Sequence, residues 1–211
     1  MNTKFVENVE SLDPQFTYRW GRLYYGLAYG IHPRVVVETG VYKAYTTAWI
    51  AAACSDIGAK FYAIDNWSYS AATLEGARDN LTACGVMDGV ELISGDALVE
   101  MRRLDERGLL EGLGLVFIDD HHEGEHVRRE IEFCWPRLTV GGAIVLHDCL
   151  CPDFPDLHNT ILDFAEEAKI TPIWFPNDRG VVMLQKMSYP ARLFFGDVNT
   201  APDGSPPLRC A

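Results

Sequence analysis

The stretch that decides the fold is Arg34–Gly40, RVVVETG, in which a run of valines ends in an acid and then turns. Unbroken β-branched runs of this kind are typical of strands that are buried on both faces of a parallel sheet. The run predicts a strand over Arg34–Glu38 and a sharp loop over Thr39–Tyr42. An acid is therefore expected where this buried strand ends.

Apolar runs and helical patterns alternate outward from this stretch, as far as Lys186. Such alternation indicates an α/β fold with a mainly parallel sheet. The last third predicts an antiparallel hairpin formed by Thr171–Phe175 and Gly180–Gln185, and Gly108–Gly114 is expected to end a helix. The other expected strands are Lys60–Ile64, Val90–Ser94, Leu115–Ile118 and Ala143–Leu146, and the expected helices include Asp13–Tyr29, Lys43–Ser55, Ala71–Cys84, Glu125–Trp135 and His158–Glu167.

The chain of 211 residues, 48% of them hydrophobic, is long enough to bury one substantial core. We expect a single domain over residues 1–189, with an N-terminal helical segment over residues 1–32. Residues 190–211 are rich in proline and are expected to form an extended tail. The sequence therefore predicts one domain and a tail.

Charge and apolar patterning disfavour several classes of partner and location. The net charge of −12 repels nucleic-acid phosphates and anionic lipid, and no apolar run approaches the roughly 20 residues that span a bilayer. The N-terminal segment lacks the basic-then-apolar order of a secretory signal. Most of the six cysteines lie in apolar periodic segments, which is typical of buried thiols in a reducing compartment. We expect a cytoplasmic protein without nucleic-acid or membrane partners.

Acidic residues follow the predicted strands, at the edge where open parallel sheets bind ligands. Carboxylates at consecutive strand ends repel polyanions, and they suit a cationic ligand with hydroxyls and an amine, or a divalent metal. The sequence therefore predicts a site of that kind at this edge. The five acids are Glu38, Asp65, Asp96, Asp119 and Asp148.

The loop after the first strand excludes the common phosphate-binding motifs. A P-loop needs G-x-x-x-x-G-K-[ST] and a dinucleotide fingerprint needs G-x-G-x-x-G, whereas residues 38–47, ETGVYKAYTT, contain Gly40 alone. A lone glycine there would let backbone approach a ligand. Asp65, which lies 27 residues after Glu38 at the neighbouring strand end, is placed to accept hydrogen bonds from ribose hydroxyls.

The segment Glu38–Thr46, ETGVYKAYT, resembles the first motif of class I S-adenosylmethionine-dependent methyltransferases. It is most similar to the small O-methyltransferases that act on catechol-type and on sugar or natural-product hydroxyls. The resemblance continues in order through AIDNW (63–67), ISGDA (93–97), VFIDDHH (116–122) and LTVGGAIVLHDC (138–149). It implies a Rossmann-like fold, a seven-stranded mostly parallel sheet with helices on both faces and a C-terminal antiparallel hairpin. It also implies methyl transfer from S-adenosyl-L-methionine to a small-molecule hydroxyl.

The resemblance also implies roles for individual residues in cofactor binding. Glu38 and Gly40 would contact the methionine part of the cofactor, and Tyr42 and Thr46 its amine and carboxylate. Asp65 would bind the ribose hydroxyls, and Trp67 would lie against the face of the adenine. Asp96 and Ala97 would contact the adenine edge, and Asp119 is also expected to bind the cofactor. Local structure offers alternatives, since Glu38, Asp65 and Asp96 could cap turns or helices. Trp67 could be core packing, and Tyr42 and Thr46 could pack locally at a helix start.

The resemblance implies a metal site and a catalytic base near the fourth and fifth strands. Asp119 and Asp148 match two ligands of the metal-dependent members, where Mg²⁺ or another divalent cation is held. The third ligand position is Cys149, which is a poor ligand for magnesium. The site could therefore use His147 or water as the third ligand, hold a softer ion, or hold no ion. His122, three residues after Asp119, is placed as the base that deprotonates the acceptor, in preference to His121.

Two other functions fit the same residues. His122 and His126 have the i, i+4 spacing of two imidazoles on one helix face, and with Asp119 and Asp148 they could form the centre of a metal-dependent hydrolase. The cysteine at position 149 is also compatible with a non-catalytic protein that binds the cofactor only. The acceptor pocket is expected around Trp20, Tyr24 and Tyr25, and a homodimer through the N-terminal helix and the tail is a further expectation.

Overall fold

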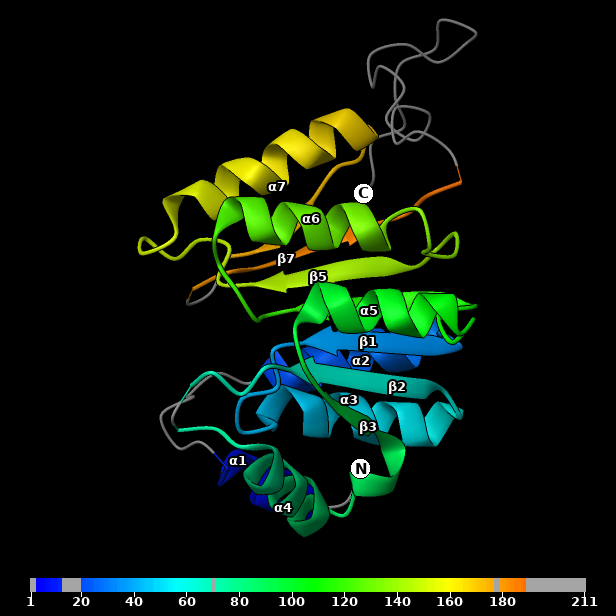
Figure 1. Cartoon of the computed structure of the whole chain (residues 1–211), viewed down its shortest axis with the longest axis vertical. Helices are drawn as coiled ribbons and strands as arrows, with labels where there is room; N and C mark the ends of the chain where they lie inside the picture. The colour runs from blue at the N-terminus through cyan, green and yellow to red at the C-terminus, as the bar shows by residue number, and fades with distance from the viewer. Residues whose placement is uncertain (1–2, 13–19, 70, 177–178, 189–211) are drawn as a thin grey trace, which may run out of the picture.

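The computed structural model describes residues 3–12, 20–69, 71–176 and 179–188. In this part of the chain seven strands form one sheet, in the order β3-β2-β1-β4-β5-β7-β6 (Figure 1). The expected tail, residues 190–211, and the expected first turns of the N-terminal helix lie outside the described residues. The strands are β1 (Val35–Thr39), β2 (Lys60–Asp65), β3 (Glu91–Ser94), β4 (Leu113–Ile118), β5 (Ala143–His147), β6 (Ile173–Phe175) and β7 (Val181–Gln185).

The pairing of the strands confirms the predicted sheet. Strands β3, β2, β1, β4 and β5 are parallel, β7 is antiparallel to β5, and β6 is antiparallel to β7. Strand β4 begins at Leu113, two residues before the expected start, and so includes Gly114. A Cβ on Gly114 would lie 2.7 Å from the Cβ of Pro33, so this glycine serves close packing within the strand rather than the end of a helix.

Helices cover both faces of the sheet. One face carries α1 (Thr3–Glu10), α2 (Trp20–Ile31), α3 (Tyr45–Ile57) and α4 (Leu74–Cys84), and the other carries α5 (Ala97–Glu106), α6 (Gly124–Cys134) and α7 (Pro155–Ala168) (Figure 1). A 3₁₀ turn, η1 (Met87–Gly89), precedes β3. The sequence did not distinguish α1, and α7 begins three residues earlier than expected because Pro155 is well suited to the first helical turn.

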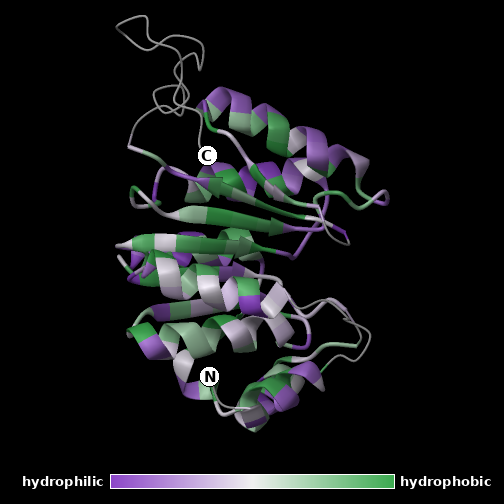
Figure 2. Cartoon of the chain, turned by 180° about the vertical axis from the view of Figure 1, so that it is seen from behind, coloured by the Kyte–Doolittle hydropathy of each residue, from purple (hydrophilic) through white to green (hydrophobic). Residues whose placement is uncertain are grey.

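Strand β1 shows why the sheet is apolar on both sides. Val36 packs in the core under α2 and α3, whereas Val35 and Val37 pack in the core under α5 and α6. Neighbouring residues of a strand point to opposite faces, so a strand buried on both sides needs an unbroken apolar run. Figure 2 shows the strands in the middle of the sheet as mostly hydrophobic.

The sheet order places a crevice at the carboxyl ends of β1 and β4. These strands are neighbours, but the chain leaves β1 toward β2 and leaves β4 toward β5. The loops after the two strands therefore diverge, and ligands of open α/β sheets bind at such a switch point. The acids that follow the strands lie around this crevice.

Candidate active site

A cavity of about 510 Å³ opens at the carboxyl ends of the strands. This volume lies within the range that holds a small organic ligand. Its wall is formed by the loops after β1 to β5, the start of α3, the turn before β7 and the first part of α2. Among the residues that line it are Trp20, Tyr24, Gly40, Tyr42, Thr46, Asp65, Asn66, Tyr69, Ala97, Asp119, His122, His147, Asp148 and Arg179.

The loop after β1 is held in place by the carboxylate of Asp65. Its Oδ2 accepts hydrogen bonds from the backbone N–H groups of Val41 and Tyr42, at 2.8 and 2.9 Å, and its Oδ1 accepts one from Trp67 at 2.6 Å. Tyr42 and Trp67 both adopt positive φ, of 50° and 56°. These conformations are disfavoured for such residues, and the three hydrogen bonds help to hold them. Asp65 thus shapes the wall of the cavity and also lines it.

Six of the nine residues expected to bind the cofactor line the cavity, namely Gly40, Tyr42, Thr46, Asp65, Ala97 and Asp119. Gly40 has a φ of 86°. The sequence suggested that a glycine is needed here so that a ligand can approach the backbone, but the structure shows a different requirement. A Cβ at this position would lie 2.2 Å from the backbone oxygen of Asp119. The missing side chain therefore makes room for the neighbouring loop, not for a ligand.

Glu38 does not line the cavity, so the expected direct contact with the cofactor is not supported. Its side chain is fully buried in β1, and neither carboxylate oxygen has a hydrogen-bond partner of normal geometry among the described residues. Burial raises the pKa of Glu38 well above its usual range, although the nearby Thr47 hydroxyl opposes this. Glu38 is thus a buried acid beneath the cavity.

Trp67 and Asp96 also lie outside the cavity lining, and the structure favours the local alternative for each. Trp67 packs against the core cluster on the α2–α3 side of the sheet. The carboxylate of Asp96 is the N-cap of α5, because it accepts a hydrogen bond from the backbone N–H of Val99 at 2.9 Å. In this part of the chain, Gly95 and Ala97 line the cavity instead.

The other end of the cavity holds the expected catalytic residues. His122 Nε2 lies 3.4 Å from Asp119 Oδ1 and 3.3 Å from Asp148 Oδ2. The imidazole of His122 stacks on the ring of Phe154, with a centroid distance of 4.4 Å and an interplanar angle of 11°. Asp148 adopts a φ of 59°, in the left-handed region that aspartate enters more readily than most residues with a side chain. The structure therefore brings Asp119, His122 and Asp148 together.

Two more basic side chains, those of His147 and Arg179, contact the same carboxylates. His147 Nδ1 lies 3.0 Å from Asp148 Oδ1 and 3.4 Å from Asp119 Oδ1, and Arg179 Nε donates to Asp148 Oδ1 at 2.8 Å. Burial lowers the pKa of His147, but Asp119 and Asp148 outweigh burial and raise that pKa to about 10. Burial likewise raises the pKa of Asp119, but His147 and His122 lower it to about 2. The two carboxylates are thus charged and compensated near neutral pH.

Cys149 does not belong to this cluster of donors. Its side chain is buried, and its thiol donates to the backbone oxygens of Leu146 and His147, at 3.2 and 3.4 Å. Burial raises the pKa of the thiol well above its usual range, so the thiolate that a metal requires is disfavoured. Cys149 is a buried structural thiol and does not supply the third ligand position.

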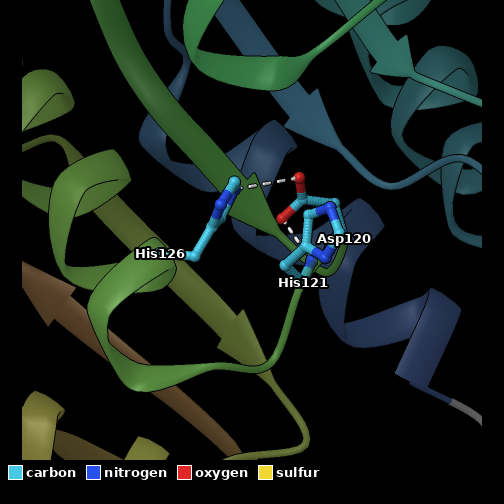
Figure 3. Close-up of side chains that lie close together, drawn as sticks. All are labelled: Asp120, His121 and His126. Atoms are coloured by element: carbon cyan, nitrogen blue, oxygen red, sulfur yellow. Dashed lines mark hydrogen bonds and ion pairs between the residues drawn. The ribbon is translucent and has the colours of Figure 1, made fainter.

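The four-residue centre expected for a hydrolase is not formed. Helix α6 begins at Gly124, so His122 precedes the helix and does not share a helix face with His126. Potential ligand atoms instead cluster in two separate groups, Asp119–His122–Asp148 and Asp120–His121–His126. In Figure 3, His126 extends from α6 toward Asp120 at the end of β4, with His121 beside them.

Sequence reasoning missed some of the residues around the cavity. Trp20 and Tyr24 line it as expected, whereas the hydroxyl of Tyr25 donates to Asp56 and the residue lies outside the lining. Arg179 was missed, although it sits in the turn of the predicted hairpin. The antiparallel pairing of β7 with β5 brings this turn beside the end of β5, which is the signal that could have identified Arg179.

The fold and this site define an α/β enzyme class that binds its ligands at the switch point of a mostly parallel sheet. Residues 37–149, more than half of the chain, match the family described as "Methyltransferase domain". The chain belongs to this methyltransferase family. No curated protein matches the sequence.

Solved methyltransferase structures share the fold. The O-methyltransferase TomG from Streptomyces achromogenes, which is involved in tomaymycin synthesis and was crystallised with SAM, is 20% identical with a TM-score of 0.68, over 89% of this chain and 91% of TomG. The SAH-bound methyltransferase PaMTH1 from Podospora anserina is 18% identical with a TM-score of 0.68, over 89% of each chain. An O-methyltransferase from Bacillus cereus in complex with SAH is 16% identical with a TM-score of 0.66, over 87% of this chain and 90% of that one.

None of the helices in the described residues is both long and apolar enough to span a membrane.

Proposed function

We propose that the protein transfers a methyl group from S-adenosyl-L-methionine to a hydroxyl oxygen of a small molecule. The observation that carries this proposal is the shared cavity. One end is lined by the loops after β1, β2 and β3, and the other by Asp119, His122 and Asp148. A donor and an acceptor that occupy the two ends would meet inside one enclosure.

The first end fits the cofactor in its chemistry. Asp65 offers carboxylate oxygens, while Gly95 has no side chain and Ala97 only a methyl group, which leaves room for a flat base. Backbone and side-chain groups of Tyr42 and Thr46 face the same space and would hold the amino-acid part. When bound, the sulfonium of the cofactor supplies the electrophilic methyl group. The chain's part is to align the acceptor hydroxyl with that methyl group and to remove its proton.

His122 is the residue that we propose as the base. Asp119 and Asp148 both face Nε2, at 3.4 and 3.3 Å, and two carboxylates there favour a proton on this nitrogen. Nδ1 is then left as the basic nitrogen that accepts the hydroxyl proton. His147 is less suited to this role, because its pKa of about 10 keeps it protonated at neutral pH.

The same cluster fits a divalent cation, and in that state His122 is a ligand and not the base. Asp119, His122 and Asp148 each offer one ligand atom, and these atoms lie within 4.8 Å of one another. Two carboxylates and one imidazole suit manganese or zinc better than magnesium, which prefers oxygen ligands alone. Bound there, a cation would lower the pKa of an acceptor hydroxyl. His147 and Arg179 compete with it, because they already contact the carboxylates.

Thermal unfolding with S-adenosylhomocysteine tests cofactor binding. A ligand that binds the native state alone raises the melting temperature, so an unchanged Tm at millimolar concentration would overturn the proposal. The His122→Ala variant tests the base, with His158→Ala as the matched control, because His158 packs on Trp174 and lies outside the cavity lining. We expect the His122 variant to keep its affinity for the cofactor product and to lose methyl transfer by about 10²-fold or more.

We further propose that the protein is a cytoplasmic enzyme in which residues 1–189 act as one domain and assemble as a homodimer. Support for the location comes from the cysteines of the described residues, which are free and buried, as expected in a reducing compartment. Light scattering on the purified protein tests the dimer, and a monomeric mass at micromolar concentration would contradict it.

A further inference from the structure

We propose that Asp120, His121 and His126, backed by Glu130, form a second cation site that takes a zinc-type divalent ion. This site is distinct from the Asp119–His122–Asp148 cluster, because the two groups share no ligand. It does not depend on the proposed methyl transfer. It joins the loop after β4 to helix α6, as Figure 3 shows.

The spacing of the ligand atoms suits a tetrahedral ion. His126 Nε2 lies 3.4 Å from Asp120 Oδ2 and 3.8 Å from Glu130 Oε2. Ligands that bind zinc at about 2.0–2.1 Å in a tetrahedron are separated by roughly 3.3 Å. The rings of His121 and His126 lie 4.5 Å apart between centroids, so a ring nitrogen of His121 reaches the same group with a small movement of its side chain.

Glu130 is the independent observation that points to a ligand. Its side chain is 0% exposed, and neither of its carboxylate oxygens has a hydrogen-bond partner of normal geometry among the described residues. Nε2 of His126 is also buried, and among the described residues it lies at ion-pair distance from Asp120 and Glu130 without a hydrogen bond of normal geometry. Within the described residues the ion-pair partner of Glu130 is His126, one helical turn before it. A buried carboxylate that faces an imidazole and a second carboxylate is costly unless a cation compensates it.

The donor chemistry selects the ion. Two imidazoles and the Asp120 carboxylate form a mixed nitrogen and oxygen set, with the Glu130 carboxylate behind His126, and such a set suits zinc and is poor for magnesium or calcium. With neutral imidazoles, the two carboxylates balance the double charge of the ion. Bound there, the ion would fix residues 119–123 against α6, and this loop carries Asp119 and His122 into the cavity. The site therefore has a structural role beside the proposed chemistry.

The alternative is a protonated Glu130 without an ion. Burial and the neighbouring Asp120 raise the pKa of Glu130 well above its usual range, so a neutral carboxyl would relieve the same cost. The two states differ in an observable way. An ion site binds zinc with a defined stoichiometry and requires His126, whereas a neutral carboxyl does neither.

The experiment is zinc titration of the chelator-treated protein by calorimetry, in a His122→Gln background that disables the first cluster. Cys210→Ser is included to remove the thiol near the C-terminus. We expect this protein to bind one zinc per chain, and we expect addition of His126→Gln to weaken binding at least tenfold. Replacing zinc with cobalt should give the intense visible absorption of a tetrahedral site in the first protein and not in the second.

Either of two results would overturn the proposed zinc site. One is that the His122→Gln protein binds no zinc, and the other is that its zinc affinity is unchanged after His126→Gln. Circular dichroism checks that each variant is folded, and Glu130→Gln replaces His126→Gln if the latter does not fold. The Tm shift with S-adenosylhomocysteine is recorded separately. A failure of cofactor binding would therefore leave the zinc result interpretable.

Discussion

The α-carbon of Gly40 packs so tightly against the backbone of Asp119 that an added Cβ would lie 2.2 Å from the Asp119 carbonyl oxygen. This contact joins the loop after β1, which lines the proposed cofactor end of the cavity, to the loop after β4, which carries the proposed catalytic residues. The two ends of the cavity are therefore coupled through backbone packing at the switch point.

Gly40→Ala is expected to destabilise the protein much more than an alanine at an open glycine. Gly58 is the matched control, because it also has a positive φ, of 72°, but has open space around its α-carbon. Left-handed backbone costs an alanine about 1–2 kcal/mol, which is the expected loss at Gly58. Overpacking against backbone adds about 1–3 kcal/mol at Gly40. Urea unfolding measures both, and equal losses would show that the loops can separate freely.

The sheet could be predicted from the sequence because strands buried on both faces have an unmistakable pattern. Val35–Val37 can pack only between two layers of helices, and the structure places them there. The predicted ends of the strands indicated where the acids would gather, and Asp65, Asp119 and Asp148 do line the cavity. Position along the chain was sufficient for these residues, because their side chains project from the strand ends themselves.

Roles that depend on side-chain direction could not be predicted in this way. Glu38 and Asp96 occupy the right junctions, but one carboxylate is buried in the sheet and the other caps a helix. His126 was placed with His122 on their i, i+4 spacing, although the helix expected over Glu125–Trp135, like the observed α6, begins after His122. Arg179 reaches the cavity through the pairing of β7 with β5, so it could be identified only by placing the predicted hairpin beside the fifth strand.

Asp65→Ala is expected to weaken binding of S-adenosylhomocysteine by tenfold or more. The substitution removes the acceptor for the N–H groups of Val41, Tyr42 and Trp67, as well as the carboxylate proposed to bind the ribose. Asp96→Ala is the control, since its loss should cost about 1 kcal/mol of stability through the helix cap and leave ligand affinity unchanged. Calorimetric titration compares them. Weakened binding in the Asp96 variant would restore its expected role at the adenine edge.

Glu38→Gln is expected to change the pH dependence of stability. Burial raises the pKa of Glu38 above its usual 4.5, so the folded protein keeps a proton that the unfolded chain releases. This contribution to stability is fully present below about pH 4.5 and is lost as the pH rises toward the folded pKa. The variant has no such proton, so its stability relative to the wild type should improve as the pH rises from 4.5 toward neutral. Urea unfolding across that range measures the difference, and parallel curves would show that Glu38 titrates normally.

Arg179→Gln is expected to raise the affinity of the Asp119–His122–Asp148 cluster for manganese. The guanidinium donates to Asp148 Oδ1 at 2.8 Å and so occupies an oxygen that an ion would use. Because the Arg179 side chain is 41% exposed, solvent weakens this ion pair, and we expect an increase of no more than about tenfold. Calorimetric titration with manganese in the His126→Gln background confines binding to this cluster. A lower affinity after loss of Arg179 would contradict competition, and would show that the guanidinium instead holds Asp148 in the orientation that the ion requires.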